Sequence, residues 1–349
     1  MTDAYARLAD YLRRFYAPDE FPALLYQAES WASSRPLNGL RILDGTPVFR
    51  NTMAKYMALI AAGAELCVPP PSVMPGDPAV LAMLPEFGIR VADGKVGEFD
   101  MVLDCAGAHA GLRPHYGFAE LTRSGVARFE GCSKPVFLAD AGMIKMIETC
   151  LGTGESFFRA LQALGYGDVQ GRELAVFGYG KVGRGLVYYA LQRKMSVTVI
   201  DRADRSQEVP DGVRFVHAGN PECVRSAVGQ AWCAVTATGV RHALEDVFRP
   251  GVPDGVLLAN MGVEDEFGPS VSVERVLSAK RPLNFILEEP TSMCYIETTM
   301  ALHNAGAVEL LRPDCPAGVF APAAQVEQEL LDIVRSRGRL AADLQLLGC

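Results

Sequence analysis

A glycine-rich turn between an apolar stretch and an amphipathic one constrains the fold more than any other segment. Residues 173–177 (ELAVF) are followed by Gly178, Gly180 and Gly183, in the spacing G-x-G-x-x-G. In this pattern the first glycine permits a tight strand-to-helix turn and the second lets the backbone approach a pyrophosphate. The third lets the helix and the strand pack closely. The segment therefore predicts the start of a dinucleotide-binding unit.

The residues that follow extend this pattern. After an amphipathic stretch, the strand-like residues 196–201 (SVTVID) end in Asp201, where a carboxylate accepts hydrogen bonds from adenosine ribose hydroxyls. A carboxylate at this point favours NAD over NADP because it repels a 2′-phosphate. Arg202 and Arg205 could hold such a phosphate, but we interpret them as part of a solvated turn. The other turn residues expected to contact the cofactor are Tyr179, Lys181 and Val182.

Two later strand ends carry small and hydroxyl residues. They close residues 231–239 (AWCAVTATG) and 255–262 (GVLLANMG). Ligands of doubly wound sheets bind beyond the carboxyl ends of the strands, so we expect these residues to line the nicotinamide half of the cofactor site. They are Thr236, Ala237, Thr238, Gly239, Asn260, Met261 and Gly262.

Short apolar runs alternate with helix-length amphipathic segments from about residue 38 onward. This rhythm predicts two α/β domains with doubly wound parallel sheets, and the glycine turn makes the second a Rossmann NAD-binding domain. The helical segment 142–164 marks the boundary. Two final helices, 292–311 and 322–346, have no expected strand between them and could close over either domain; we assign them to the first. The expected strands are 40–45, 64–70, 89–93, 99–105 and 135–140, then 173–177, 196–201, 213–219, 231–239, 255–262 and 282–289. The predicted domains are 1–150, a substrate domain completed by 292–349, and 151–291.

Composition excludes several classes of protein. The chain has 33 basic and 41 acidic side chains, a net charge of −8, which disfavours nucleic acids and anionic membranes as partners. Its nine cysteines show no metal-ligand spacing, so we expect no metal site and reduced thiols. No apolar stretch is long enough to span a bilayer, and the N-terminus does not read as a secretion signal. We expect a cytoplasmic protein that binds a small molecule.

The chain resembles the S-adenosylhomocysteine hydrolase (adenosylhomocysteinase) family nearly from end to end. The motifs that carry the resemblance are SSRPLNGLRIL (33–43), GAEL (63–66), GTGES (152–156), VFGYGKVGRG, VTATG and LLANMG. In that family a tightly held NAD oxidises a ribose 3′-hydroxyl, which acidifies the neighbouring C4′ proton so that the thiol can leave. The resemblance implies two α/β domains with the active site between them, and a homo-oligomer, a dimer or tetramer.

The substrate half departs from the family's pattern. The family's H-x-T motif is replaced by residues 47–49 (PVF), and the second aspartate of its LDDGG motif by Cys105. Its adenosine-contacting glutamate is replaced by Leu121, and the histidine after N-x-G by Val263. These changes remove donors, acceptors and proton relays together. Hydrolysis of S-adenosylhomocysteine is therefore disfavoured, whereas hydride transfer at a nicotinamide needs fewer of the lost groups.

Candidate proton-transfer residues come from the helix where the family has a lysine and an aspartate one turn apart. Ungapped counting places Glu148 on the aspartate and Thr149 on a cofactor-contacting asparagine, with Lys145 one residue from the lysine position. Lys145 and Glu148 can share a helix face. His303 either forms an acid/base pair with Glu297, six residues before it, or is a surface or packed histidine of a helix.

Other polar residues leave two interpretations open. Arg50 and Arg123 could each clamp a substrate carboxylate or face solvent.

We predict an NAD-dependent oxidoreductase that transfers a hydride at a carbinol or amine carbon of a small polar metabolite. The alternatives are a divergent S-adenosylhomocysteine hydrolase and a non-catalytic NAD-binding protein.

Overall fold

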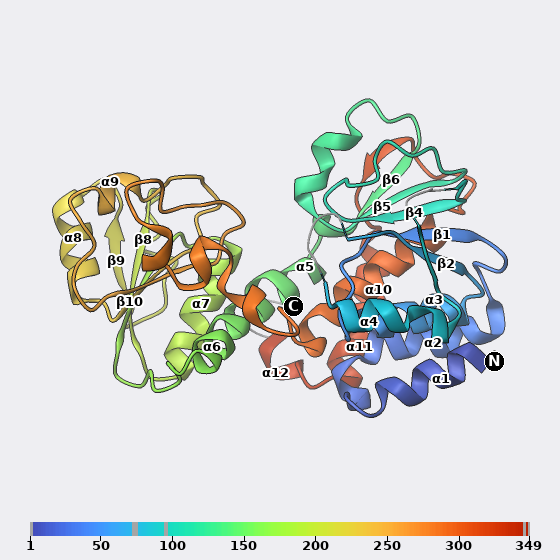
Figure 1. The fold of residues 1–349 in the computed structure, drawn as a ribbon, viewed down its shortest axis with the longest axis horizontal. Coiled ribbons are helices and arrows are strands. Elements are labelled where there is room, and N and C mark those ends of the chain that lie inside the picture. Colours follow the sequence, from blue (N-terminus) through green and yellow to red (C-terminus); the bar gives the residue numbers. More distant parts are fainter. Residues whose placement is uncertain (1–2, 72–75, 94–96, 345–346, 348–349) are drawn as a thin grey trace. The chain divides into compact units, whose positions relative to one another are not determined.

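The chain forms two compact units, each built on its own parallel sheet (Figure 1). The computed structural model describes residues 3–71, 76–93, 97–344 and 347. Unit 1 comprises Met1–Ile147 and Ser292–Cys349, and unit 2 comprises Glu148–Thr291. Two parallel α/β sheets confirm the predicted fold class.

Unit 1 holds a seven-stranded sheet in the order β12-β6-β5-β4-β1-β2-β3. Its strands are β1 (Arg41–Asp44), β2 (Glu65–Val68), β3 (Arg90–Val91), β4 (Met101–Asp104), β5 (Gly117–Glu120), β6 (Pro135–Leu138) and β12 (Gly318–Phe320). Its helices are α1 (Asp3–Leu12), α2 (Pro22–Ser34), α3 (Thr52–Ala61), α4 (Pro78–Met83), α5 (Ile144–Met146), α10 (Met293–Glu309), α11 (Ala324–Arg337) and α12 (Ala341–Leu344). The long helix α10 packs against β4, β5 and α3, so the C-terminal segment is part of this unit's core.

Unit 2 holds a five-stranded sheet in the order β11-β10-β7-β8-β9. Its strands are β7 (Glu173–Phe177), β8 (Ser196–Asp201), β9 (Arg214–His217), β10 (Cys233–Thr236) and β11 (Leu257–Asn260). Its helices are α6 (Thr153–Ala163), α7 (Lys181–Gln192), α8 (Pro221–Gln230) and α9 (Glu245–Phe248). The first strand lies inside the sheet, the next two extend to one side and the last two to the other. This is the strand order of a Rossmann fold, in which ligands bind where the order reverses, here between β7 and β10.

The structure corrects the expected elements in three places. Residues 282–289 are not a strand: Leu283–Ile286 form a 3₁₀ turn, and Pro282, which has no N–H for a ladder, makes only an isolated bridge to Asn260. Strand β5 was not expected. The final helices do have a strand between them, β12, which adds to the edge of unit 1's sheet through β6.

The helix that was expected at the boundary is not regular. Between α5 and α6, residues Ile147–Gly152 form a π-helix, a wider turn that is frequent at functional sites. The expectation that Lys145 and Glu148 share a helix face assumes α-helical geometry. Glu148 lies in the π-helix, where this geometry does not hold. Across the described ranges, no helix combines the length and the apolar character that crossing a membrane requires.

Candidate cofactor site and buried acidic cluster

The glycine turn of unit 2 joins β7 to the N-terminus of α7. Gly178 adopts φ +91°, and a Cβ there would lie 2.7 Å from the carbonyl oxygen of Ala237. A Cβ on Gly183 would lie 1.9 Å from the Gly178 carbonyl oxygen, so this glycine permits the close approach of helix and strand. At Gly180 a Cβ would meet nothing within 4 Å. The exposed Gly180 thus leaves open space beside the helix N-terminus, whose N–H groups attract anions.

Asp201 lies beside this turn at the carboxyl end of β8. Its Oδ2 accepts a hydrogen bond from the backbone N–H of Tyr179 at 2.7 Å, and its Oδ1 accepts one from Ala203 at 2.9 Å. The carboxylate is therefore fixed against the glycine turn, at the place where a Rossmann acid meets the adenosine ribose. Tyr179 itself is buried, and the guanidinium of Arg184 stacks over its ring at 4.8 Å.

A cavity of about 430 Å³ opens over the same sheet edge. Gly178, Gly180 and Asp201 line it beside an apolar wall, which suits a nucleotide with a flat base, a ribose and a phosphate. Arg202 and Arg205 also line the cavity, although the Arg205 guanidinium pairs with Glu208 at 2.7 Å. The wall consists of Ile200, Ala218, Val224, Ala243, Leu244 and Val247. These residues fit the adenosine half of a dinucleotide, with its base, ribose and phosphate.

The loop after β10 is held by a residue that the sequence did not single out, Glu266. Its carboxylate is fully buried and accepts hydrogen bonds from Thr236, Thr238 and Gly239. The hydroxyls of both threonines, which were expected at the cofactor site, donate to this carboxylate, and Ala237 and Thr238 also line the cavity. No motif spacing marks Glu266. The nearest signal in the sequence is a polar VEDE run directly after a predicted strand.

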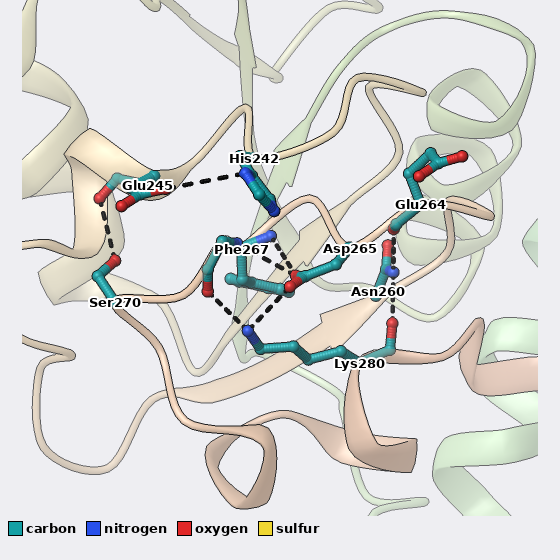
Figure 2. A network of polar contacts seen from close by, with 9 residues as sticks. His242, Glu245, Asn260, Glu264, Asp265, Phe267, Ser270 and Lys280 are labelled. Atoms are coloured by element: carbon teal, nitrogen blue, oxygen red, sulfur yellow. Dashed lines mark hydrogen bonds and ion pairs between the residues drawn. The ribbon is translucent and has the colours of Figure 1, made fainter.

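Asn260 and Gly262, at the end of β11, also have local partners. The Asn260 amide donates to the backbone carbonyls of Glu264 and Lys280 (Figure 2). Its Oδ1 accepts from the N–H of Gly262. Asn260 therefore organises the following loop, and its amide is committed to that role. Met261, between the two, is buried.

Lys280 anchors the far end of this loop. Its ammonium forms an ion pair with Asp265 at 3.0 Å and donates to the Gly268 carbonyl at 2.6 Å (Figure 2). Lys280, with Ser278 and Ala279 before it, adopts the left-handed region, at φ values of 65°, 57° and 53°. Non-glycine residues reach this region at a cost of about 1 kcal/mol or more each. The Asp265–Lys280 pair and the Asn260 amide hold this turn in place.

The remaining cofactor and proton-transfer candidates occupy different surroundings. Lys181 is exposed at the first residue of α7, Val182 is half-buried, and Thr149 is half-buried in the π-helix. Lys145 is buried in unit 1, and its Nζ donates to the carbonyl of Leu121 at 3.3 Å. Leu121 directly follows β5, so this ammonium lies at the carboxyl edge of unit 1's sheet. Glu148 is half-buried at the start of unit 2.

Three strands of unit 1 end in buried acids. They are Asp44 on β1, Asp104 on β4 and Glu120 on β5. Asp44 and Asp104 accept N–H groups of the loop that follows their own strand. Glu120 instead accepts from Ala106 and Gly107 of the loop after β4, both at 2.9 Å. The acids thus shape the carboxyl edge of this sheet, where ligands bind in doubly wound folds.

A buried ion pair joins Asp44 to Lys55 of α3. Both side chains are inaccessible to solvent, and Thr46 N donates to the second oxygen of Asp44 at 2.9 Å. Burial alone would raise the pKa of Asp44, but the Lys55 ammonium holds it below its usual value. Burial lowers the pKa of Lys55, and Asp44 opposes that shift. Removing either partner would leave an uncompensated buried charge.

His109 lies next to this pair and was not among the expected site residues. Its ring packs on the backbone of Gly45, where an added Cβ would lie 2.8 Å from Cδ2. Its Nε2 is buried, with no hydrogen-bond partner among the described residues. Burial also raises the pKa of the neighbouring Asp104 carboxyl to about 7. Burial lowers the pKa of the His109 imidazole below its usual value, so Asp104 is the one of these two groups that titrates near neutral pH.

The surroundings of His303 do not suit the acid/base role considered for it. It is fully buried in α10, with Nε2 2.8 Å from the carbonyl oxygen of Ala119. Burial, with the charge of Lys55, lowers its pKa to about 3, so the ring is neutral at physiological pH. We correct the assignment: His303 is a packed histidine of the core. Glu297 serves a different helix, because its Oε2 accepts from Ala23 N and Leu24 N at the start of α2.

The two arginines weighed as carboxylate clamps have other neighbours. The Arg50 guanidinium stacks over the ring of Phe15 at 4.5 Å. Arg123 is exposed, and its backbone N–H donates to Asp140. Cys105 is buried beside Asp104, as expected of an inert thiol.

The sequence is similar to those of known hydrolases. The chain is 26% identical to the adenosylhomocysteinase of Aeropyrum pernix over 314 residues, which cover 78% of this chain and 72% of that protein. It is 26% identical to the S-inosyl-L-homocysteine hydrolase of Methanopyrus kandleri over 71% of this chain and 65% of that protein. These similarities confirm the resemblance to adenosylhomocysteinases. No family model matches the sequence.

A solved structure supports the fold alone. The crystal structure of a dipicolinate synthase subunit from Bacillus halodurans superimposes with a TM-score of 0.53 at 11% sequence identity. The match covers 79% of this chain and 99% of that one. The scaffold is therefore shared with named enzymes, whereas the substrate of this chain is a separate question.

Proposed function

We propose that the protein is an NAD-dependent oxidoreductase on an adenosylhomocysteinase-like scaffold. The observation that carries the proposal is the cavity of about 430 Å³ lined by Gly178, Gly180 and Asp201. The glycine turn would hold the pyrophosphate, and Asp201 the adenosine ribose. NAD supplies a hydride acceptor when bound. The similarity to two hydrolases of nucleosyl-homocysteine compounds supports a metabolite-sized substrate.

Unit 1 is proposed as the substrate domain. The reaction would remove a hydride from a carbinol or amine carbon and a proton from its oxygen or nitrogen, so that a ketone or imine is formed. Lys145 and Glu148 are the proposed proton-transfer groups; Lys145 lies in α5 and Glu148 in the π-helix that directly follows it. The acid-rich carboxyl edge of unit 1's sheet favours a polar substrate.

The first experiment identifies what the protein holds. Purified protein is denatured and the released small molecules are analysed by mass spectrometry, and each candidate metabolite is then added with NAD. We expect release of NAD or NADH, and formation of NADH with one alcohol or amine. Loss of that turnover in Lys145→Ala or Glu148→Ala, with NAD affinity retained, would support their role.

The same protein preparation tests the alternative activities. Similarity to adenosylhomocysteinases favours hydrolysis as the second candidate. Incubation with S-adenosylhomocysteine followed by thiol detection decides between them: release of homocysteine would overturn our proposal. Bound NAD that no metabolite reduces would instead favour a non-catalytic NAD-binding protein.

A further inference from the structure

Glu266 is a buried carboxylate with no positively charged partner among the described residues. It is inaccessible to solvent and lies between the loops that follow β10 and β11. Its contacts come from the Thr236 hydroxyl, the Thr238 N–H at 2.8 Å and hydroxyl at 2.6 Å, and the Gly239 N–H at 2.8 Å. All four of these groups donate to the carboxyl oxygens, and hydrogen bonds of this kind favour the ionised form of a carboxylate.

The strand order determines which half of a dinucleotide this charge would face. The glycine turn follows β7, and Asp201 ends β8 on one side of it. A cofactor with its pyrophosphate at the turn and its adenosine toward Asp201 therefore places its nicotinamide toward β10 and β11. Glu266 belongs to that second side. Gly262 leaves room for it, because a Cβ there would lie 1.9 Å from Glu266 Oε1.

The two redox forms of the cofactor differ in charge at this end. The nicotinamide ring is a cation when oxidised and neutral when reduced. A buried carboxylate attracts a nearby cation more strongly than an exposed one does, because little water screens it. We propose that Glu266 makes the site of unit 2 bind NAD in preference to NADH, so that the protein rests with its cofactor ready to accept a hydride. This inference rests on the proposed function.

The test compares the affinities of the two cofactor forms. Dissociation constants for NAD and NADH are measured by calorimetry on the full chain, on Glu266→Gln and on Glu264→Gln. The glutamine keeps the size of the side chain and removes its charge. Glu264 is exposed on the same loop, and its backbone carbonyl binds Asn260, so Glu264→Gln is the matched control.

We expect the unmodified chain to bind NAD more tightly than NADH, and Glu266→Gln to reduce that preference about tenfold. Glu264→Gln should leave the ratio unchanged. An unchanged ratio in a folded Glu266→Gln protein would overturn the inference. Tighter binding of NADH than of NAD by the unmodified chain would also overturn the inference, whatever the variants show. If the unmodified chain binds neither form, the proposed function itself fails.

Discussion

Asp201 carries the clearest single-residue expectation for cofactor binding. Its carboxylate is held against the glycine turn by two backbone N–H groups. Replacing it with alanine removes hydrogen bonds to a charged group, each worth about 1.5–3 kcal/mol. We expect Asp201→Ala to raise the NAD dissociation constant about tenfold or more in a calorimetric titration. The exposed Asp204 is the control, and Asp204→Ala should bind NAD like the unmodified chain.

Glu297 gives an expectation for stability. Burial raises the pKa of its carboxyl from 4.5 to about 8. The folded state therefore favours the protonated acid, and this stabilisation is complete below about pH 4.5 and is lost as the pH rises through about 8. Relative to Glu297→Gln, the unmodified chain should lose about 1 kcal/mol of stability per pH unit between about pH 5 and 8.

Thermal unfolding of both proteins across this pH range measures the effect. Glutamine can still accept hydrogen bonds from Ala23 and Leu24, so the start of α2 keeps its partner. The exposed Glu86 is the matched control, and Glu86→Gln should follow the unmodified chain at every pH. Parallel curves for the unmodified chain and Glu297→Gln would show that the buried acid does not titrate in this range.

The sequence predicted single residues where a local pattern names them. Gly178 and Asp201 stand at fixed places around a strand–turn–helix unit, and the structure brings them together. Glu266 and His109 have no such spacing, because their environments come from loops of neighbouring strands. The sequence allows His303 to be either a surface or a core residue of its helix. Which of the two it is depends on how the helix packs, and the sequence does not show this.

At the level of elements, two glycines of the turn should respond differently to alanine. Gly183 has no space for a Cβ, which would lie 1.9 Å from the Gly178 carbonyl oxygen, whereas Gly180 faces open space. Gly183→Ala should therefore lower the thermal unfolding temperature as well as NAD affinity. Gly180→Ala should leave the unfolding temperature unchanged and weaken NAD binding, since the added methyl group fills the space that the pyrophosphate needs.

Thermal unfolding without cofactor, followed by calorimetry with NAD, separates the two effects. Equal losses of stability in both variants would mean that the turn does not have the geometry described here. Unchanged NAD affinity in Gly180→Ala would show that the pyrophosphate does not bind beside Gly180.

The elements that the sequence predicted well are those with strong local patterns. The strands around the glycine turn alternate with amphipathic helices and have the expected bounds within a residue or two. Residues 282–289 are apolar enough for a strand, but Pro282 and Pro290 break the ladder. Strand β12 has three residues, and its identity depends on pairing with β6, which lies far earlier in the chain.

For the whole molecule, unit 2 should fold by itself. It is one continuous segment with a five-stranded sheet of its own, and an apolar core cluster lies within residues 175–276. We expect residues 148–291, expressed alone, to be folded by circular dichroism and to bind NAD within about tenfold of the full chain's affinity. An insoluble segment, or a folded one that does not bind, would contradict this.

The alternation of strands and helices was enough to predict two parallel sheets. The sequence alone does not determine that the C-terminal helices pack on unit 1. An amphipathic helix needs an apolar surface to pack against, but its pattern does not tell which domain supplies that surface. In the structure α10 supplies that contact through β4, β5 and α3. The acids at the carboxyl edge of unit 1's sheet were beyond prediction for the same reason, because they meet only after distant strands pair.

The most direct test of NAD binding is a crystal structure of the full chain grown with NAD. We expect electron density for the dinucleotide at the glycine turn, with its pyrophosphate against the N-terminus of α7 and its adenosine ribose hydroxyls on the Asp201 carboxylate. A well-ordered turn that stays empty at saturating NAD, or a dinucleotide bound elsewhere on the chain, would contradict it.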